Sequence, residues 1–246
     1  MTLTFSALLQ KAPAASARQR AGILAGLAVI SALLTTYAGD DPWRVLQIAL
    51  DKDVRTPILP GLYFGLVLGV ALYLWTSKNA FNVAAVLIVT VAAWIVAHHT
   101  AVTVYRHHDA WAHHLQDQFA QHLAGVVDQY RDRLSKTLPP DKMPEISGSP
   151  PRIEYPYTLA IGGILAGLVG SALTAFGVSM FSAAFRTVEN WLRTLAIGTI
   201  AGVLLQWPEI EILPGASLPL LFLVWQPAVA ASIGYGLATS TVRAQG

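Results

Sequence analysis

The sequence predicts an all-α fold, a polytopic integral membrane bundle of about six transmembrane helices with an extramembrane amphipathic helix after the third span. Two observations lead to this expectation. The 246 residues are 54% hydrophobic and only 12% charged, whereas about 25% of the residues in an ordinary soluble domain are charged. The few charges also cluster, and the long uncharged runs between them are typical of helices that cross a bilayer.

Six uncharged runs are candidate spans. A bilayer core of about 30 Å needs roughly 20 apolar residues in a helix; four of the runs exceed that length and the first is close to it. We expect the first run to be a span and not a cleaved signal peptide, because the run is long. The runs are residues 21–39, 56–77, 79–105, 155–185, 194–208 and 212–242.

The fifth run is the weakest candidate, because residues 194–208 number only fifteen. They can cross a bilayer only if the helix begins near Trp191 and Arg193 extends its side chain to the membrane interface. A re-entrant segment is the alternative. With six spans, the chain divides into an N-terminal segment (1–20), spans one to three (21–105), an extramembrane helix with a Pro-rich loop (106–155), spans four to six (156–242) and a C-terminal tail (243–246).

The distribution of charge predicts the orientation. Six spans put both termini on one side, which then holds seven basic residues and one acid, while the other side holds nine basic residues and thirteen acids. Lys and Arg in short loops mark the cytoplasmic side, and the loop with Glu209 and Glu211 has neither. We therefore expect a protein of a bacterial inner membrane, with both termini in the cytoplasm and residues 106–155 outside.

Small residues recur four positions apart in most of the spans. This pattern lets helix backbones approach closely in lipid, where no hydrophobic force draws helices together. We expect the glycines to pack the helices of this bundle, and the three-glycine face of the second span could also contact a second copy of the chain. The packing candidates are Gly22, Gly26, Gly61, Gly65, Gly69, Gly163, Gly167, Gly198 and Gly202.

Two short motifs occur twice. Gly-Ile-Leu-Ala-Gly-Leu is found at 22–27 and at 163–168, each time opening a span, and Ile-Leu-Pro-Gly is found at 58–61 and at 212–215. A duplicated three-helix unit is one interpretation. The second motif, however, precedes the second span in one half and the third span in the other, so the two halves do not correspond in register.

Residues 106–155 form the only sizeable polar region. Apolar residues recur there every three or four positions, which predicts a helix that continues the third span to about Leu138. Six prolines between 139 and 156 then predict an extended return to the fourth span. The apolar stripe needs a partner, which could be the membrane interface, the outer loops, a second copy or another protein. It contains Trp111, Leu115, Phe119, Leu123, Val126, Tyr130, Leu134 and Leu138.

All seven histidines lie between residues 98 and 122. A site for a divalent metal ion is one interpretation; solvated histidines and a pH-responsive surface are the others. Chelation within one helix needs ligands three or four residues apart, and no two of these histidines have that spacing. Only Asp109, His113 and Asp117 recur at a stride of four, with His114 and His122 beside them. A metal site would therefore need ligands from a second helix or chain, and no other cofactor is expected.

The deepest polar group in the spans is Gln226. Pro227 follows it and frees the carbonyl of Leu223, so we expect a kink that could line a pathway, although kinked helices with an inward amide are also common in passive bundles. No Asp, Glu, Lys or Arg lies deep in a predicted span. Proton pumps and strongly ion-coupled transporters usually need such a residue, so both are disfavoured.

The motifs of several enzyme classes are missing. The sequence contains no HExxH, Walker A or GxSxG motif and no cysteine, and its net charge of +2 does not favour nucleic-acid binding. We expect a non-enzymatic, membrane-embedded accessory or scaffold subunit that binds another membrane protein or forms a homo-oligomer. The alternative is a passive or weakly coupled channel or transporter for a small solute or divalent cation. A water-accessible cavity reaching Gln226 would favour this alternative.

Overall fold

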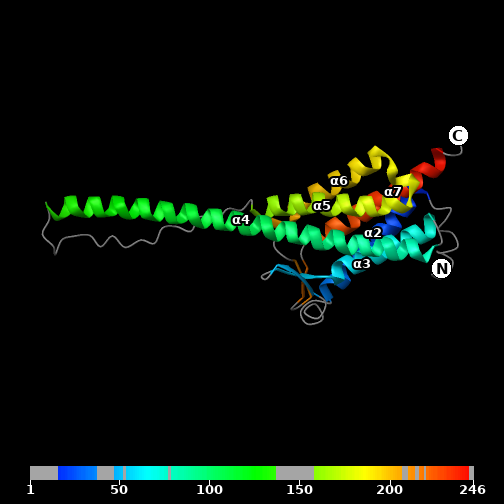
Figure 1. The fold of residues 1–246 in the computed structure, drawn as a ribbon, viewed down its shortest axis with the longest axis horizontal. Coiled ribbons are helices and arrows are strands. Elements are labelled where there is room, and N and C mark those ends of the chain that lie inside the picture. The colour runs from blue at the N-terminus through cyan, green and yellow to red at the C-terminus, as the bar shows by residue number, and fades with distance from the viewer. Residues whose placement is uncertain are drawn as a thin grey trace.

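A computed structural model of the protein describes residues 16–37, 47–51, 54–76, 79–136, 158–206, 210–213, 216–218 and 220–243. Over these ranges the chain is an all-α polytopic membrane bundle with two small β-hairpins (Figure 1). Five of the described helices are long and apolar enough to cross a membrane, and a further apolar helix is shorter. The predicted fold class is therefore confirmed. The Pro-rich segment expected to return to the fourth span lies outside the described residues.

The first two spans begin with recognisable helix starts. Helix α2 (Ala17–Tyr37) follows a reciprocal cap, in which the Gln19 amide nitrogen donates to Ser16 Oγ and the Ser16 amide nitrogen donates to Gln19 Oε1. Helix α3 (Leu59–Trp75) has Pro60 in its first turn, where a missing N–H breaks no helical hydrogen bond. With 17 residues, α3 is the shorter apolar helix of the bundle.

The third span and the polar helix after it form one element, α4 (Ala80–Ser135). The side chain of Asn79 caps its start by accepting a hydrogen bond from the Phe81 amide. Its 56 residues correspond to about 84 Å of helix, and Figure 1 shows α4 running far beyond the other helices. The expected continuation of the third span is confirmed, and the helix ends three residues before the predicted Leu138.

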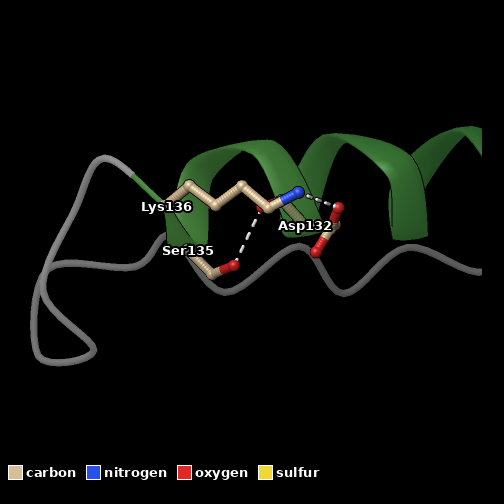
Figure 2. A network of polar contacts seen from close by, with 3 residues as sticks. All are labelled: Asp132, Ser135 and Lys136. Carbon is tan, nitrogen blue, oxygen red and sulfur yellow. Dashed lines mark hydrogen bonds and ion pairs between the residues drawn. The ribbon is translucent and has the colours of Figure 1, made fainter.

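Polar contacts close the last turn of α4 (Figure 2). Lys136 Nζ donates to Asp132 Oδ2 at 2.8 Å, and Ser135 Oγ donates to the backbone carbonyl oxygen of Asp132 at 2.9 Å. The Ser135 contact occupies a carbonyl that has no partner further along the helix. Both contacts are exposed, so they contribute little to the free energy of folding.

The last three spans follow α4. They are α5 (Thr158–Phe181), α6 (Val188–Gly202) and α7 (Leu220–Arg243), with 3₁₀ turns at Ala183–Arg186 and Val203–Gln206. Helix α6 begins six residues before the predicted fifth span, where Thr187 Oγ1 caps the Asn190 amide. This earlier start gives an apolar segment of 18 residues, Val188–Leu205, which is long enough to cross a membrane.

Two predicted spans begin later than expected, because hairpins precede them. Strands β1 (Gln47–Asp51) and β2 (Val54–Pro57) pair antiparallel, as do β3 (Ile210–Leu213) and β4 (Ala216–Leu218). Residues 56–57 and most of 212–219 were predicted as helix, and that prediction is wrong. Prolines explain the error, because Pro57, Pro214 and Pro219 disfavour helix in the residues before them, and those three preceding residues all lie in strands.

The order of helix packing brings the first and the last described helices together. Helix α2 packs along α7, α3 along α4, α4 along α5, and α5 along α6, which also contacts α7. The core between them is apolar, and its largest buried side chains include Leu24, Leu68, Leu72, Phe185 and Ile233.

Candidate functional site

One end of the bundle gathers basic side chains. Arg20, at the start of α2, donates from Nη1 to the backbone carbonyl oxygen of Leu237 at 3.1 Å, and its guanidinium lies 5.5 Å from the ring centroid of Trp75. Arg186 donates to the carbonyl oxygens of Ser179 and Met180. The start of α2 and the ends of α3, α5 and α7 therefore lie at one end, and the long part of α4 projects from the other (Figure 1).

A buried polar network joins α6 to α7 near this basic end. Arg193 Nη2 donates to Asn190 Oδ1 at 2.7 Å and to the carbonyl oxygen of Ser232 at 3.2 Å, and its guanidinium lies 4.6 Å from the Tyr235 ring centroid. Thr194 Oγ1 and Ser232 Oγ are 2.8 Å apart. The sequence analysis missed this network, because only Arg193 stood out, as a residue that had to reach the interface.

Four of the candidate glycines bring α5 and α6 into backbone contact. A Cβ atom on Gly163 would collide with the carbonyl oxygen of Gly202, and one on Gly167 would collide with that of Gly198. The two small-xxx-small patterns therefore face each other across one interface. Such close approach is the arrangement that these patterns permit in lipid.

The three glycines of α3 face α4. A Cβ atom on Gly61 would lie 2.8 Å from Trp94 Cβ, one on Gly65 would lie 3.2 Å from Leu87 Cα, and one on Gly69 would lie 2.8 Å from Val83 Cγ1. This face is occupied within the chain. The expected packing within this bundle therefore accounts for all three glycines, and contact with a second copy stays a prediction.

Gly22 and Gly26 pack against nothing in the described part of the chain, so their role in helix packing stays a prediction. A Cβ atom on either glycine would have no neighbour within 4 Å. The side of α2 that faces the bundle carries Leu24 and Ala28 instead, both fully buried. Leu24 and Ala28 lie on the opposite face of the helix from Gly22 and Gly26. The small-xxx-small pattern of α2 is therefore on the face that turns away from the bundle.

The histidine-rich part of α4 brings two of the five proposed metal ligands together. His113 Nε2 lies 3.5 Å from Asp109 Oδ2, with both side chains about half exposed. A separate contact joins His114 to Gln118, whose Nε2 atoms are 3.1 Å apart. No described contact joins Asp117 or His122 to the pair of Asp109 and His113. Among the described residues, no three His, Asp or Glu side chains converge to hold a metal ion. Binding with ligands from another chain stays a prediction.

A partly open cavity of about 110 Å³ lies between the helices beside Gln226. Helices α3, α4, α5 and α7 form its walls, which are almost entirely apolar, and the aromatic pairs Phe64–Trp225 and Trp94–Phe222 border it with ring centroids 5.6 and 5.3 Å apart. Gln226 is 1% exposed. Pro227 lies inside helix α7, which continues to Arg243, and the kink expected there stays a prediction.

One edge of the cavity is held by hydrogen bonds to the first hairpin. Trp94 Nε1 donates to the carbonyl oxygen of Pro57 at 2.6 Å, and His98 Nδ1 lies 3.1 Å from Thr56 Oγ1. His98 is thus a structural contact of β2, placed apart from the exposed histidines further along α4. These bonds fix the position of two cavity-lining side chains.

Comparison with known proteins returned nothing: no protein-family model, curated protein or solved structure matches this chain.

Proposed function

We propose that this integral membrane protein is a non-enzymatic accessory or scaffold subunit that holds another membrane protein through residues 106–135 of α4, here called the α4 extension. The observation that carries the proposal is the apolar stripe along this helix. Phe119, Val126 and Tyr130 are 45%, 49% and 55% exposed, respectively. They share one face, since positions three and four apart adjoin on a helix.

The α4 extension is a long helix that projects from the bundle without packing against another described helix. Gly162, near the start of α5, lies against Ala101. The contact of α4 with α5 ends near that residue, and about 51 Å of helix continues beyond it to Ser135. Isolated helices are marginally stable in water, and most helical stability in proteins comes from packing of an apolar face. A protein partner on the stripe would supply that packing.

The geometry favours a protein over the lipid surface as the partner. The α4 extension continues the line of a spanning helix without a break (Figure 1), so it leads away from the bilayer. The face opposite the stripe is polar and includes Gln121, Asp128 and Asp132, as expected if only the stripe is covered.

For the orientation, we propose cytoplasmic termini, an external α4 extension and a bacterial inner membrane. Arg20, Arg186 and Arg193 at the end of the bundle opposite the α4 extension support this orientation, because basic residues near span ends favour the cytoplasmic side.

A passive transporter is the second candidate, and the cavity at Gln226 is the observation that favours it. The apolar walls of the cavity argue against a transporter, because a polar solute or cation would lose its hydration there without gaining ligands from the protein. We therefore rank the accessory role first.

Site-specific photo-crosslinking in intact cells tests the proposal. A photoreactive phenylalanine analogue is placed at Phe119 or Tyr130 on the stripe, and at Gln121 or Asp128 on the opposite face as matched controls. We expect one discrete heavier product from the stripe positions only. Adding Val126→Glu should remove it, because a carboxylate in an apolar contact is strongly unfavourable, whereas Gln121→Glu should not.

Two outcomes would contradict the proposal. Equal crosslinking from both faces, or none from either, would show that the stripe has no specific protein partner. A product composed of two copies of this chain, recognised by two different tags, would replace the accessory role with a homo-oligomer.

A further inference from the structure

The cavity beside Gln226 extends along several turns of α4. Along α4 its lining extends from Thr90 to Ala101, which corresponds to about 16 Å of helix. Small side chains leave the space open, among them Ala93 and Ala97 of α4 and Ala166 of α5. The described lining contains no Asp, Glu, Lys or Arg, so the walls offer an apolar surface and little else.

Two polar atoms of cavity-lining residues have no hydrogen-bond partner. They are Oε1 of Gln226 and the indole Nε1 of Trp225, both buried. Buried polar atoms in proteins are nearly always paired, so each of these atoms requires an explanation. Gln226 Oε1 is an acceptor and Trp225 Nε1 is a donor, and a hydroxyl group has both the donor that the first lacks and the acceptor that the second lacks.

We propose that the cavity is a binding site for a small lipophilic alcohol, with an apolar body of about the size of benzene against the aromatic walls and its hydroxyl group hydrogen-bonded to Gln226. The size follows from the volume, because an apolar protein cavity of about 150 Å³ binds benzene. A whole membrane lipid is too large, and an acyl tail has no hydroxyl group to bring to the amide. The site is independent of the partner proposed for the α4 extension.

Matched ligands and variants separate the parts of this proposal. The protein is reconstituted in phosphatidylcholine nanodiscs, and the binding of benzyl alcohol and of toluene is measured by ligand-observed NMR, with each concentration corrected for partition into the lipid. The variants are Gln226→Leu, which removes the amide, and Ala166→Leu, which fills the cavity. Leu165→Ala is the control, since Leu165 is the adjacent residue of α5 and is exposed at the bundle surface.

We expect the preference of the wild type for benzyl alcohol over toluene to fall about threefold to tenfold in Gln226→Leu, as for loss of one neutral hydrogen bond. Ala166→Leu should lose both ligands, and Leu165→Ala should keep both. Without ligand, Gln226→Leu should unfold at the same temperature as the wild type or higher, because it removes an unsatisfied buried amide.

Three results would overturn the proposal. If neither ligand binds the wild type, the cavity is not a site for such alcohols and water is the hydrogen-bond partner of the Gln226 amide. If Ala166→Leu binds both ligands like the wild type, they bind elsewhere. If Gln226→Leu keeps the preference for the alcohol, or is much less stable than the wild type without ligand, the amide has a structural role and is not the binding group.

Discussion

Gly167 of α5 and Gly198 of α6 lie so close that a Cβ atom on Gly167 would collide with the Gly198 carbonyl oxygen. The same relationship recurs one turn away between Gly163 and Gly202. These contacts hold the C-terminal part of α6, residues 198–202, against α5. The fifth run is the shortest of the predicted spans, and this backbone contact stabilises it as a helix packed against α5.

The first prediction concerns the glycines of α3. Gly65→Leu should lower the free energy of unfolding by about 1–3 kcal/mol, because a large side chain would force apart the α3 and α4 backbones. Gly26→Leu is the matched control and should be neutral or slightly stabilising, since Gly26 has no neighbour and leucine favours helix more than glycine does. Thermal unfolding in detergent measures both, and equal effects would show that the α3 face is not tightly packed.

Charge-free runs predicted where the helices lie, because the bilayer imposes one length and one composition on every span. They could not predict which face of a helix meets a neighbour. The hexapeptide Gly-Ile-Leu-Ala-Gly-Leu occurs in both α2 and α5, yet Gly163 and Gly167 touch the α6 backbone while Gly22 and Gly26 touch nothing described. The same local sequence has different contacts, since the contacts depend on the rotation of each helix in the bundle.

The candidate sites, too, were predictable only in part: single residues stood out in the sequence, but their surroundings did not. Gln226 stood out in the sequence as a deep polar residue, but the cavity beside it depends on four helices whose small and aromatic side chains converge from distant positions. The network of Arg193, Asn190 and Ser232 was equally hidden, because serine and asparagine are ordinary in sequence and gain importance only when they are buried together.

The second prediction concerns this network. Arg193→Met should destabilise the protein by about 1–3 kcal/mol, because Asn190 and Ser232 would lose a charged hydrogen-bond donor while buried. Arg131→Met is the control, since Arg131 makes only an exposed pair with Asp128 at 3.9 Å. Unchanged unfolding temperatures for both variants would show that Arg193 does not hold α6 to α7.

The third prediction concerns orientation, and the lack of native cysteine makes it direct. Ser135→Cys, at the exposed end of the α4 extension, should react with a membrane-impermeant thiol reagent in intact cells. Thr76→Cys, also exposed but at the opposite end of the bundle, should react only after lysis. The reverse pattern would place the α4 extension in the cytoplasm.

The last prediction concerns metal binding by the exposed histidines. Asp109 and His113 are the two proposed ligands that lie together, and a single pair gives weak and unselective binding. Any selective site must add ligands from a second chain or protein, so affinity for Zn²⁺ at pH 7.5 should depend on oligomeric state. His113→Ala should abolish the binding, whereas His98→Ala should leave it nearly intact, because His98 is fifteen residues or about 22 Å away along α4 and is engaged with Thr56. Calorimetry on monomeric and oligomeric fractions measures this dependence. If neither fraction binds Zn²⁺, Ni²⁺ or Co²⁺, the histidines are an ordinary polar surface of the α4 extension.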